Sequence, residues 1–154
     1  MSGCKVVFAA DLSDHSGYAF QWYIDNFHHP DNKVIIATCP EYSVGSGDSS
    51  PARIEEMILE VNGKTEQLKA KYLEEMNKYG VTGEVMVLDD NKPGHAICDL
   101  VKKMDATYVV TGTRGHGKIR RTILGSVSDY ILHHSQAPVL VCRQKGGDKP
   151  RPSH

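Results

Sequence analysis

One segment rich in glycine and basic residues has a composition suited to binding an anion. The stretch TGTRGHGKIRRTILGS, residues 111–126, contains four glycines and four lysines or arginines, and it has no acidic residue. It directly follows the apolar run YVV, residues 108–110. Glycine lets the main chain come close to a ligand because it carries no Cβ. The segment could therefore hold a phosphate, bind a nucleic acid or simply form a turn.

The nearest familiar pattern is the phosphate loop, G-x-x-x-x-G-K-[ST]. Residues 112–118 match it, but Ile119 replaces the hydroxyl residue that would coordinate magnesium. The segment also follows the fourth predicted strand, whereas a phosphate loop usually follows the first strand of its fold. The dinucleotide fingerprint G-x-G-x-x-G fails as well, because Arg120 stands at its last position. We interpret both matches as coincidental.

A different spacing of the same glycines predicts a site in two parts. Gly112 and Gly115 are separated by two residues, and nine further residues lead to Gly125 and Ser126. Residues 125–128 are predicted to open a helix, whose free N–H groups and positive dipole end attract phosphate. The hydroxyls of Ser126 and Ser128 could add donors, and the basic residues at 118–121 could steer an anion. A plain turn with a serine cap is the alternative.

The elements that position this segment alternate regularly between strands and helices. Apolar runs predict strands at residues 5–10, 34–39, 84–89, 106–112 and 137–143. Helical spacing predicts helices at 17–27, at 50–78 and at 126–134, and a short helix that follows the segment 90–96. Such alternation indicates one doubly wound, five-stranded parallel sheet with helices on both faces, a Rossmann-like α/β fold. We expect one domain over residues 1–143 and a polar, disordered tail at 144–154.

Apolar stripes on the predicted helices indicate which faces point inward. The first helix is expected to bury Ala19, Phe20, Tyr23, Ile24 and Phe27. The long second helix is expected to bury Ile54, Met57, Ile58, Val61, Leu68 and Tyr72. The third is expected to turn Ile97, Leu100, Val101 and Met104 inward.

Polar residues after the first strand should lie near the glycine-rich segment. Asp11 and Ser13 follow that strand, and in a doubly wound sheet ligands bind at the carboxyl ends of the strands, where the strand order reverses. A carboxylate at Asp11 suits a ribose hydroxyl. Asp11 could also cap the helix that follows, and the two roles are compatible.

Composition narrows the possible partners. The chain has 154 residues and a net charge of -1, so it carries no overall attraction to nucleic acid or to an anionic membrane. No apolar run approaches the length of a membrane span, and no signal peptide is evident, so a cytoplasmic protein is expected. The four cysteines are scattered without metal-ligand spacing, which favours reduced thiols, and no metal-binding cluster is predicted.

The segment at 112–126 resembles the G-x-x-G-(nine residues)-G-[ST] nucleotide motif of the universal stress protein family, in its ATP-binding branch. The resemblance extends to residue 143. VVFAADLSDHSGYAF, residues 6–20, is similar to the first strand of the family, with Asp11 and Ser13 in place, and GSVSDYILHHSQAPVLVCR, residues 125–143, is similar to its ending. The loop DDNKPGH, residues 89–95, departs from the short glycine–proline turn of the family, and Pro93 is expected to fill that role.

This resemblance implies an adenine nucleotide, ATP or else ADP or AMP, bound with Mg²⁺ or Mn²⁺. It implies that Asp11 and Gly112 contact the ribose and that main chain near Ala9 and Cys39 lines the adenine. It further implies that the phosphates are held by Gly115, Gly125, Ser126, Val127 and Ser128, and Thr113 is included among the nucleotide-binding residues. The family often dimerises through its last strand, here Val139–Cys142, which implies a homodimer.

The function implied is that of a nucleotide-binding stress-response sensor or regulator with at most slow ATP hydrolysis. No catalytic residue is assigned, because no nucleophile, base and orienting group are evident together. An enzyme of the same fold that uses ATP to activate a second substrate is one alternative. A nucleic-acid-binding module using the basic loop at 114–121 is less favoured, since this loop lacks an aromatic platform for bases.

Overall fold

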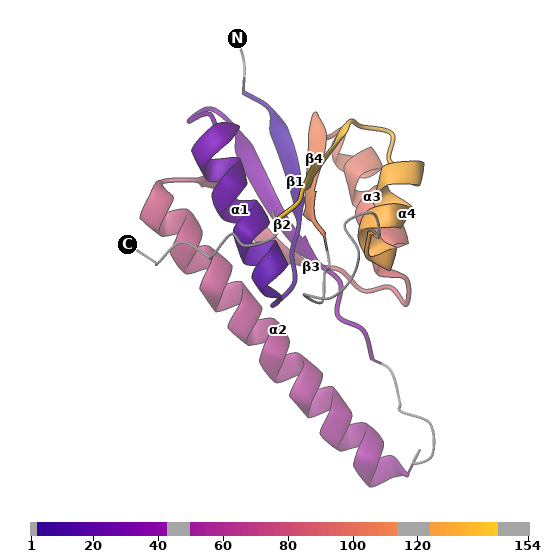
Figure 1. Ribbon diagram of the computed structural model, residues 1–154. Helices are drawn as coiled ribbons and strands as arrows, with labels where there is room; N and C mark the ends of the chain where they lie inside the picture. The colour runs from indigo at the N-terminus through magenta and orange to yellow at the C-terminus, as the bar shows by residue number, and fades with distance from the viewer. Residues whose placement is uncertain (1–2, 43–49, 114–123, 145–154) are drawn as a thin grey trace.

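The computed structural model describes residues 3–42, 50–113 and 124–144, which alternate between strands and helices (Figure 1). The strands are β1 (Lys5–Ala9), β2 (Lys33–Thr38), β3 (Thr82–Val87), β4 (Tyr108–Gly112) and β5 (Val139–Cys142). The helices are α1 (Asp14–Asn26), α2 (Pro51–Tyr79), α3 (Pro93–Met104) and α4 (Ser126–His134).

The described strands form a five-stranded parallel sheet in the order β3-β2-β1-β4-β5. Val7 of β1 pairs with Ile35 of β2 on one side and with Val109 of β4 on the other. Strands β2 and β3 lie in turn on one side of β1, and strands β4 and β5 lie in turn on its other side. The order therefore reverses between β1 and β4, and the predicted doubly wound fold is confirmed.

Two hydrophobic cores lie on opposite faces of the sheet. Phe8 and alternate strand residues pack against α1 and α2, where the rings of Phe20 and Tyr72 meet edge to face with centroids 5.4 Å apart. Val7 and its neighbours on the other face pack against α3 and α4. Figure 1 shows these two helix pairs on either side of the sheet. Residues on both faces of the central strands are buried, which explains their continuous apolar sequences.

Local capping signals set the ends of the helices. The Ser13 side chain accepts a hydrogen bond from the Ser16 N–H at the start of α1, and Ser50 does the same for Arg53 at the start of α2. Gly80 ends α2 in the left-handed conformation, with a φ of 64°. The helix predicted at 50–78 is therefore confirmed to within a residue at each end.

The apolar stripe predicted for α2 is wrong over the first half of the helix. Leu68 and Tyr72 are buried as expected, but Ile58 is 40% exposed, and Ile54, Met57 and Val61 are only half-buried. The helix has 29 residues, about 44 Å, whereas the six residues of β2 span about 20 Å. Its first half therefore extends past the sheet, as Figure 1 shows.

Smaller differences follow from where elements end. Phe27 was expected in the core but is 49% exposed, because α1 ends at Asn26. Strand β3 begins at Thr82, two residues before the predicted start, directly after the turn that closes α2.

Cys142 is buried, the other three cysteines are half-buried, and all four are free thiols. None of the helices in the described ranges is both long and apolar enough to cross a membrane.

Candidate functional site

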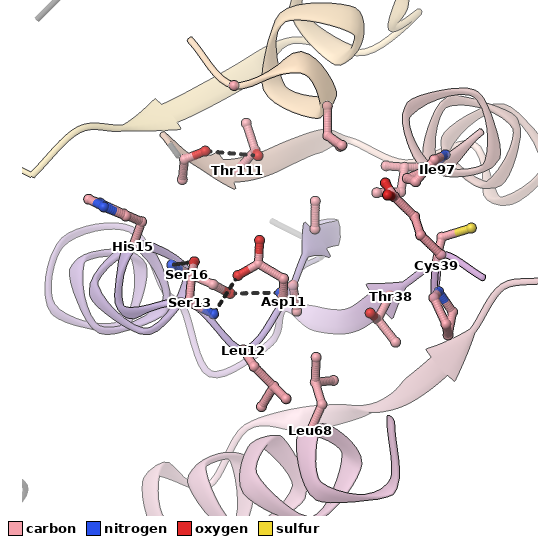
Figure 2. A pocket seen from close by; sticks show the side chains of 18 of the residues that line it. Asp11, Leu12, Ser13, His15, Ser16, Thr38, Cys39, Leu68, Ile97 and Thr111 are labelled. Atoms are coloured by element: carbon pink, nitrogen blue, oxygen red, sulfur yellow. Dashed lines mark hydrogen bonds between the residues drawn. The ribbon is translucent and has the colours of Figure 1, made fainter. Parts of the chain in front are cut away.

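A cavity of about 300 Å³ opens at the carboxyl edge of the sheet, where the strand order reverses. Figure 2 shows Asp11 near its centre, with Leu12 and Leu68 on the side of α2 and Thr111 of β4 opposite. The end of β2 and the beginnings of α3 and α4 complete the wall. The fold therefore places a cavity where parallel sheets of this kind bind their ligands.

Two hydrogen bonds hold Asp11 in the turn between β1 and α1, and a third joins the two serines that bond to it. The carboxylate oxygen Oδ1 of Asp11 accepts from the N–H of Ser13 over 2.7 Å. The N–H of Asp11 donates to Oγ of Ser16 over 3.1 Å, and the N–H of Ser16 donates in turn to Oγ of Ser13. Ser13, not Asp11, is the residue that caps α1. The carboxylate of Asp11 faces the cavity (Figure 2).

Gly112 ends β4 at a point where no side chain fits. A Cβ built on Gly112 would lie 2.7 Å from the carbonyl oxygen of His15 and 3.2 Å from Cβ of Ala19. The missing side chain allows β4 to approach the first turns of α1. Both Gly112 and the following Thr113 line the cavity.

The start of α4 forms the wall opposite α2. Gly125 is the N-cap residue, and Gly125, Val127 and Ser128 line the cavity. The first N–H groups of a helix have no acceptor within the helix, so they can serve an anion. Ser126 is exposed and does not line the cavity.

The hydroxyl of Ser128 has a role that the sequence did not indicate. It donates to the carbonyl oxygen of Gly112 over 2.6 Å, and its oxygen lies 3.1 Å from Oγ1 of Thr111. Ser128 is buried, so this contact ties α4 to the end of β4. The proton that we expected Ser128 to offer to a phosphate is donated to Gly112 in this structure.

The end of β2 is joined to the loop before α3 by a cysteine. The Cys39 thiol donates to the carbonyl oxygen of Asp90 over 3.3 Å, and burial raises the pKa of this thiol, which keeps it protonated. The Asp90 carboxylate contacts His95 at 3.1 Å and the N–H of Lys92 at 3.0 Å. These contacts, that of His95 first, lower the pKa of Asp90. They hold the loop before α3, and Pro93 at the start of α3 lines the cavity.

A further wall was not predicted from the sequence. Val61, Lys64, Thr65 and Leu68 of α2 line the cavity together with Leu12. Helical periodicity indicated that Leu68 and Val61 share a face, but it could not indicate that this face covers the carboxyl edge of the sheet. The wall adds apolar surface and one lysine, which pairs with Glu60 at 3.6 Å.

Most of the predicted site residues meet around this one cavity. Those that line it are Ala9, Asp11, Cys39, Gly112, Thr113, Gly125, Val127 and Ser128. Gly115, His116 and the basic residues of the loop at 114–121 lie outside the described residues. Within the described ranges, no group of three or more His, Cys, Asp or Glu side chains could hold a metal ion.

The fold and this cavity define a doubly wound α/β protein with a cavity at the strand-order reversal. The model of the universal stress protein family matches residues 4–143, so the chain belongs to that family. The relatives include universal stress protein PHOS32 of Arabidopsis thaliana, 26% identical over 155 residues. That alignment covers 90% of this chain but only 64% of PHOS32.

Solved structures share the fold along nearly the whole chain. UspA of Lactobacillus plantarum has a TM-score of 0.74 at 17% identity, covering 93% of this chain and 99% of that one. A universal stress protein family protein of Arabidopsis thaliana, solved with AMP bound, has a TM-score of 0.69 at 20% identity. The coverage there is 92% of both chains.

Proposed function

We propose that this protein binds an adenine nucleotide, ATP or else ADP or AMP, in the cavity between β1 and β4. The observation that carries the proposal is that a carboxylate, a glycine-ended strand and a helix N-terminus face one cavity at the strand-order reversal. The carboxylate suits a ribose hydroxyl, and the helix N-terminus suits a phosphate. The glycine at the end of the strand lets the ligand come close to the main chain.

The cavity has walls that fit such a ligand. In the proposed complex the base lies against main chain near Ala9 and Cys39, and the ribose lies beside Asp11 and Gly112. The phosphates lie at the N–H groups of residues 125–128. We propose that Gly115, which lies outside the described residues, contacts them as well. A cavity of about 300 Å³ is at the lower end of the range for small-molecule sites.

Related structures support an adenine nucleotide as the ligand. The universal stress proteins that resemble this chain include structures solved with AMP, with cAMP and with dAMP. These three ligands share an adenine, a five-membered sugar and a phosphate. The same three parts are the ones that the walls of this cavity suit.

A divalent ion would reach this site together with the nucleotide. Asp11 and Glu41 are the carboxylates among the described residues that line the cavity. Mg²⁺ prefers six oxygen ligands and often takes several of them from water and from substrate phosphates. We therefore propose that Mg²⁺ or Mn²⁺ is held by the phosphates of the nucleotide and by water.

Calorimetric titration with ATP, ADP and AMP tests the proposed binding. We expect the wild-type protein to bind at least one of the three, and we expect Asp11→Asn to weaken that affinity about 10-fold, the scale of one lost hydrogen bond to a charged group. Asp25→Asn is the matched control, because Asp25 is an exposed residue of α1 whose carboxylate accepts from Gln21. No binding by the wild type would overturn the proposal, as would equal losses in the two variants.

We propose a cytoplasmic regulator that responds to the bound nucleotide, with at most slow hydrolysis. Asp11 is the acidic group nearest the centre of the cavity, and in the proposed complex it contacts the ribose, so it is not placed to activate a water at the phosphates. Incubation with ATP followed by product analysis separates this role from that of an ATP-using enzyme. Rapid release of phosphate or pyrophosphate would contradict the regulatory role.

A further inference from the structure

A chain of buried hydrogen bonds connects helix α2 to the loop that carries Asp11. The hydroxyl of Tyr72 lies 2.5 Å from Oγ of Ser16. That same Oγ accepts a hydrogen bond from the main-chain N–H of Asp11 over 3.1 Å. The relay therefore runs from Tyr72 through Ser16 to Asp11, and it joins residues 56 positions apart in the chain.

Both hydroxyls of the relay are shielded from water. Ser16 is 4% exposed and Tyr72 is 1% exposed. The Tyr72 ring is held in place between Phe8, at a centroid distance of 6.0 Å, and Phe20, at 5.4 Å. Burial raises the pKa of Tyr72, so its phenol keeps its proton. Ser16 also lines the cavity, whereas Tyr72 does not, so the Tyr72 end of the relay is the more fully shielded.

The bonding capacity of Ser16 allows its hydroxyl to bond to Asp11 and to Tyr72 at the same time. A serine hydroxyl has one proton to donate and two lone pairs that can accept. One lone pair of Ser16 receives the Asp11 N–H, which leaves the hydroxyl proton and the other lone pair for Tyr72. If the Tyr72 hydroxyl is removed, the Ser16 hydroxyl loses a partner in a buried site, where an unsatisfied polar group is costly.

The orientation of Asp11 depends on the same loop. Its N–H is fixed by Ser16, and its carboxylate is fixed by the N–H of Ser13, which in turn precedes the first turn of α1. Figure 2 shows these bonds converging on Asp11 at the centre of the cavity. A small rotation of the peptide at Asp11 would therefore swing the carboxylate within the cavity.

We infer that Tyr72 and Ser16 are positioning residues for Asp11, and that the relay from α2 sets how strongly the site binds the hydroxyls of a ribose. This inference rests on the proposed function, because it assigns the ribose to Asp11. Neither hydroxyl needs to contact the nucleotide. The contribution of Tyr72 passes through Ser16 and the main chain of the loop.

The test compares two ligands across three variants by calorimetric titration. The ligands are AMP and 2′,3′-dideoxy-AMP, which lacks both ribose hydroxyls. Tyr72→Phe removes one hydroxyl of the relay and Ser16→Ala removes the other. Tyr79→Phe is the matched control, because Tyr79 lies on the same helix and its hydroxyl donates to Gln21 over 2.9 Å, away from the cavity. Thermal unfolding of each variant confirms that it is folded.

The relay predicts a loss of binding affinity in the variants only when the ligand carries ribose hydroxyls. We expect Tyr72→Phe and Ser16→Ala to weaken AMP binding about 3- to 10-fold, as expected for about one hydrogen bond. Their affinity for 2′,3′-dideoxy-AMP should match that of the wild type, and Tyr79→Phe should leave both affinities unchanged. Ser16→Ala carries the test if Tyr72→Phe does not fold.

Three outcomes would overturn the inference, and they are distinguishable from failure of the proposed function. Equal losses for both ligands would show that the hydroxyls only support the general shape of the cavity. Unchanged AMP affinity in both variants would show that Asp11 does not depend on the relay. The same loss in Tyr79→Phe would show a general effect of loosening α2. If the wild type binds ATP or ADP in place of AMP, the same comparison uses that nucleotide and its 2′,3′-dideoxy form. A wild-type protein that binds none of ATP, ADP and AMP would instead overturn the proposed function itself.

Discussion

Gly112 combines a packing role with a place at the cavity. Its missing side chain lets β4 approach the carbonyl oxygen of His15, and its own carbonyl oxygen accepts the hydroxyl of Ser128. The sequence indicated this glycine as part of an anion site. The structure gives a second reason for glycine here, which is the contact between β4 and α1.

We expect Gly112→Ala to destabilise the protein by about 1–3 kcal/mol, because the new methyl group would overlap main chain that cannot easily move. Chemical denaturation measures this loss. Gly63→Ala is the control, since a Cβ at Gly63 meets nothing within 4 Å and the residue lies inside α2. That change should stabilise by about 0.5–1 kcal/mol. Equal stability of the two variants would contradict the close approach at Gly112.

The types of single residues can be predicted to form a site from the sequence, but their contacts in the folded protein cannot. Asp11, Gly112 and Gly125 were recognised because their types and spacing carry chemistry that does not depend on the rest of the chain. The commitment of the Ser128 hydroxyl to Gly112 could not be recognised, because it depends on how α4 packs against β4. The same holds for Tyr72, whose sequence pattern indicates only a core position.

Among the elements, α2 differs most from its sequence-based description. Its caps at Ser50 and Gly80 are local signals, and the predicted bounds of 50–78 agree with the observed ends to within a residue. Its apolar stripe continues through both halves, but the described core contacts only the second half, where Leu68, Tyr72 and Met76 are buried. Periodicity fixes the face of a helix that is apolar, whereas the length of the sheet beneath decides how much of that face is covered.

We expect the first half of α2 to exchange its amide hydrogens faster than the second half. Few buried contacts hold residues 52–63, and Leu59 there is 67% exposed, whereas residues 68–79 pack on the sheet. Hydrogen–deuterium exchange followed by mass spectrometry compares peptides from the two halves of the same helix. Equal protection in the two halves would indicate that another surface covers the first half in solution.

For the whole molecule, the outer edge of strand β5 is the surface most suited to a second copy of the chain. Within the described residues, β5 pairs only with β4, so its other edge is available. Val139 and Leu140 pack against the two cores, whereas Val141 is half-buried and belongs to neither. An apolar edge strand favours pairing with another chain. We propose a homodimer through Val139–Cys142.

Light scattering coupled to gel filtration tests this dimer. We expect the wild-type mass to be twice that of one chain and the mass of Val141→Lys to be that of a monomer, because a lysine on an edge strand opposes pairing. Val87→Lys is the control, since Val87 is an exposed residue at the end of β3, on the opposite edge of the sheet. A monomeric wild type, or dissociation by both variants, would contradict the proposed interface.

The architecture as a whole was predictable because each strand is a short apolar run and each helix has a helical apolar pattern. Alternation then leaves a doubly wound sheet as the natural arrangement, and the structure confirms it. The part of the cavity wall formed by α2 was not predictable, because local sequence patterns do not indicate which edge of the sheet a long helix extends beyond. The fold therefore followed from local signals, while the wall that α2 adds to the cavity depended on tertiary packing.

The pairing of β1 with β4 has a consequence for protein synthesis. The N–H of Lys5 bonds to Thr107, 102 positions later in the chain, and the two strands are the ones that flank the cavity. As the chain emerges from the ribosome, β1, β2 and β3 can assemble early, while the ligand site must wait for the last third of the protein. The proposed nucleotide could therefore bind only after the residues of β4 and the start of α4 are made, and its binding would then stabilise the folded protein against unfolding.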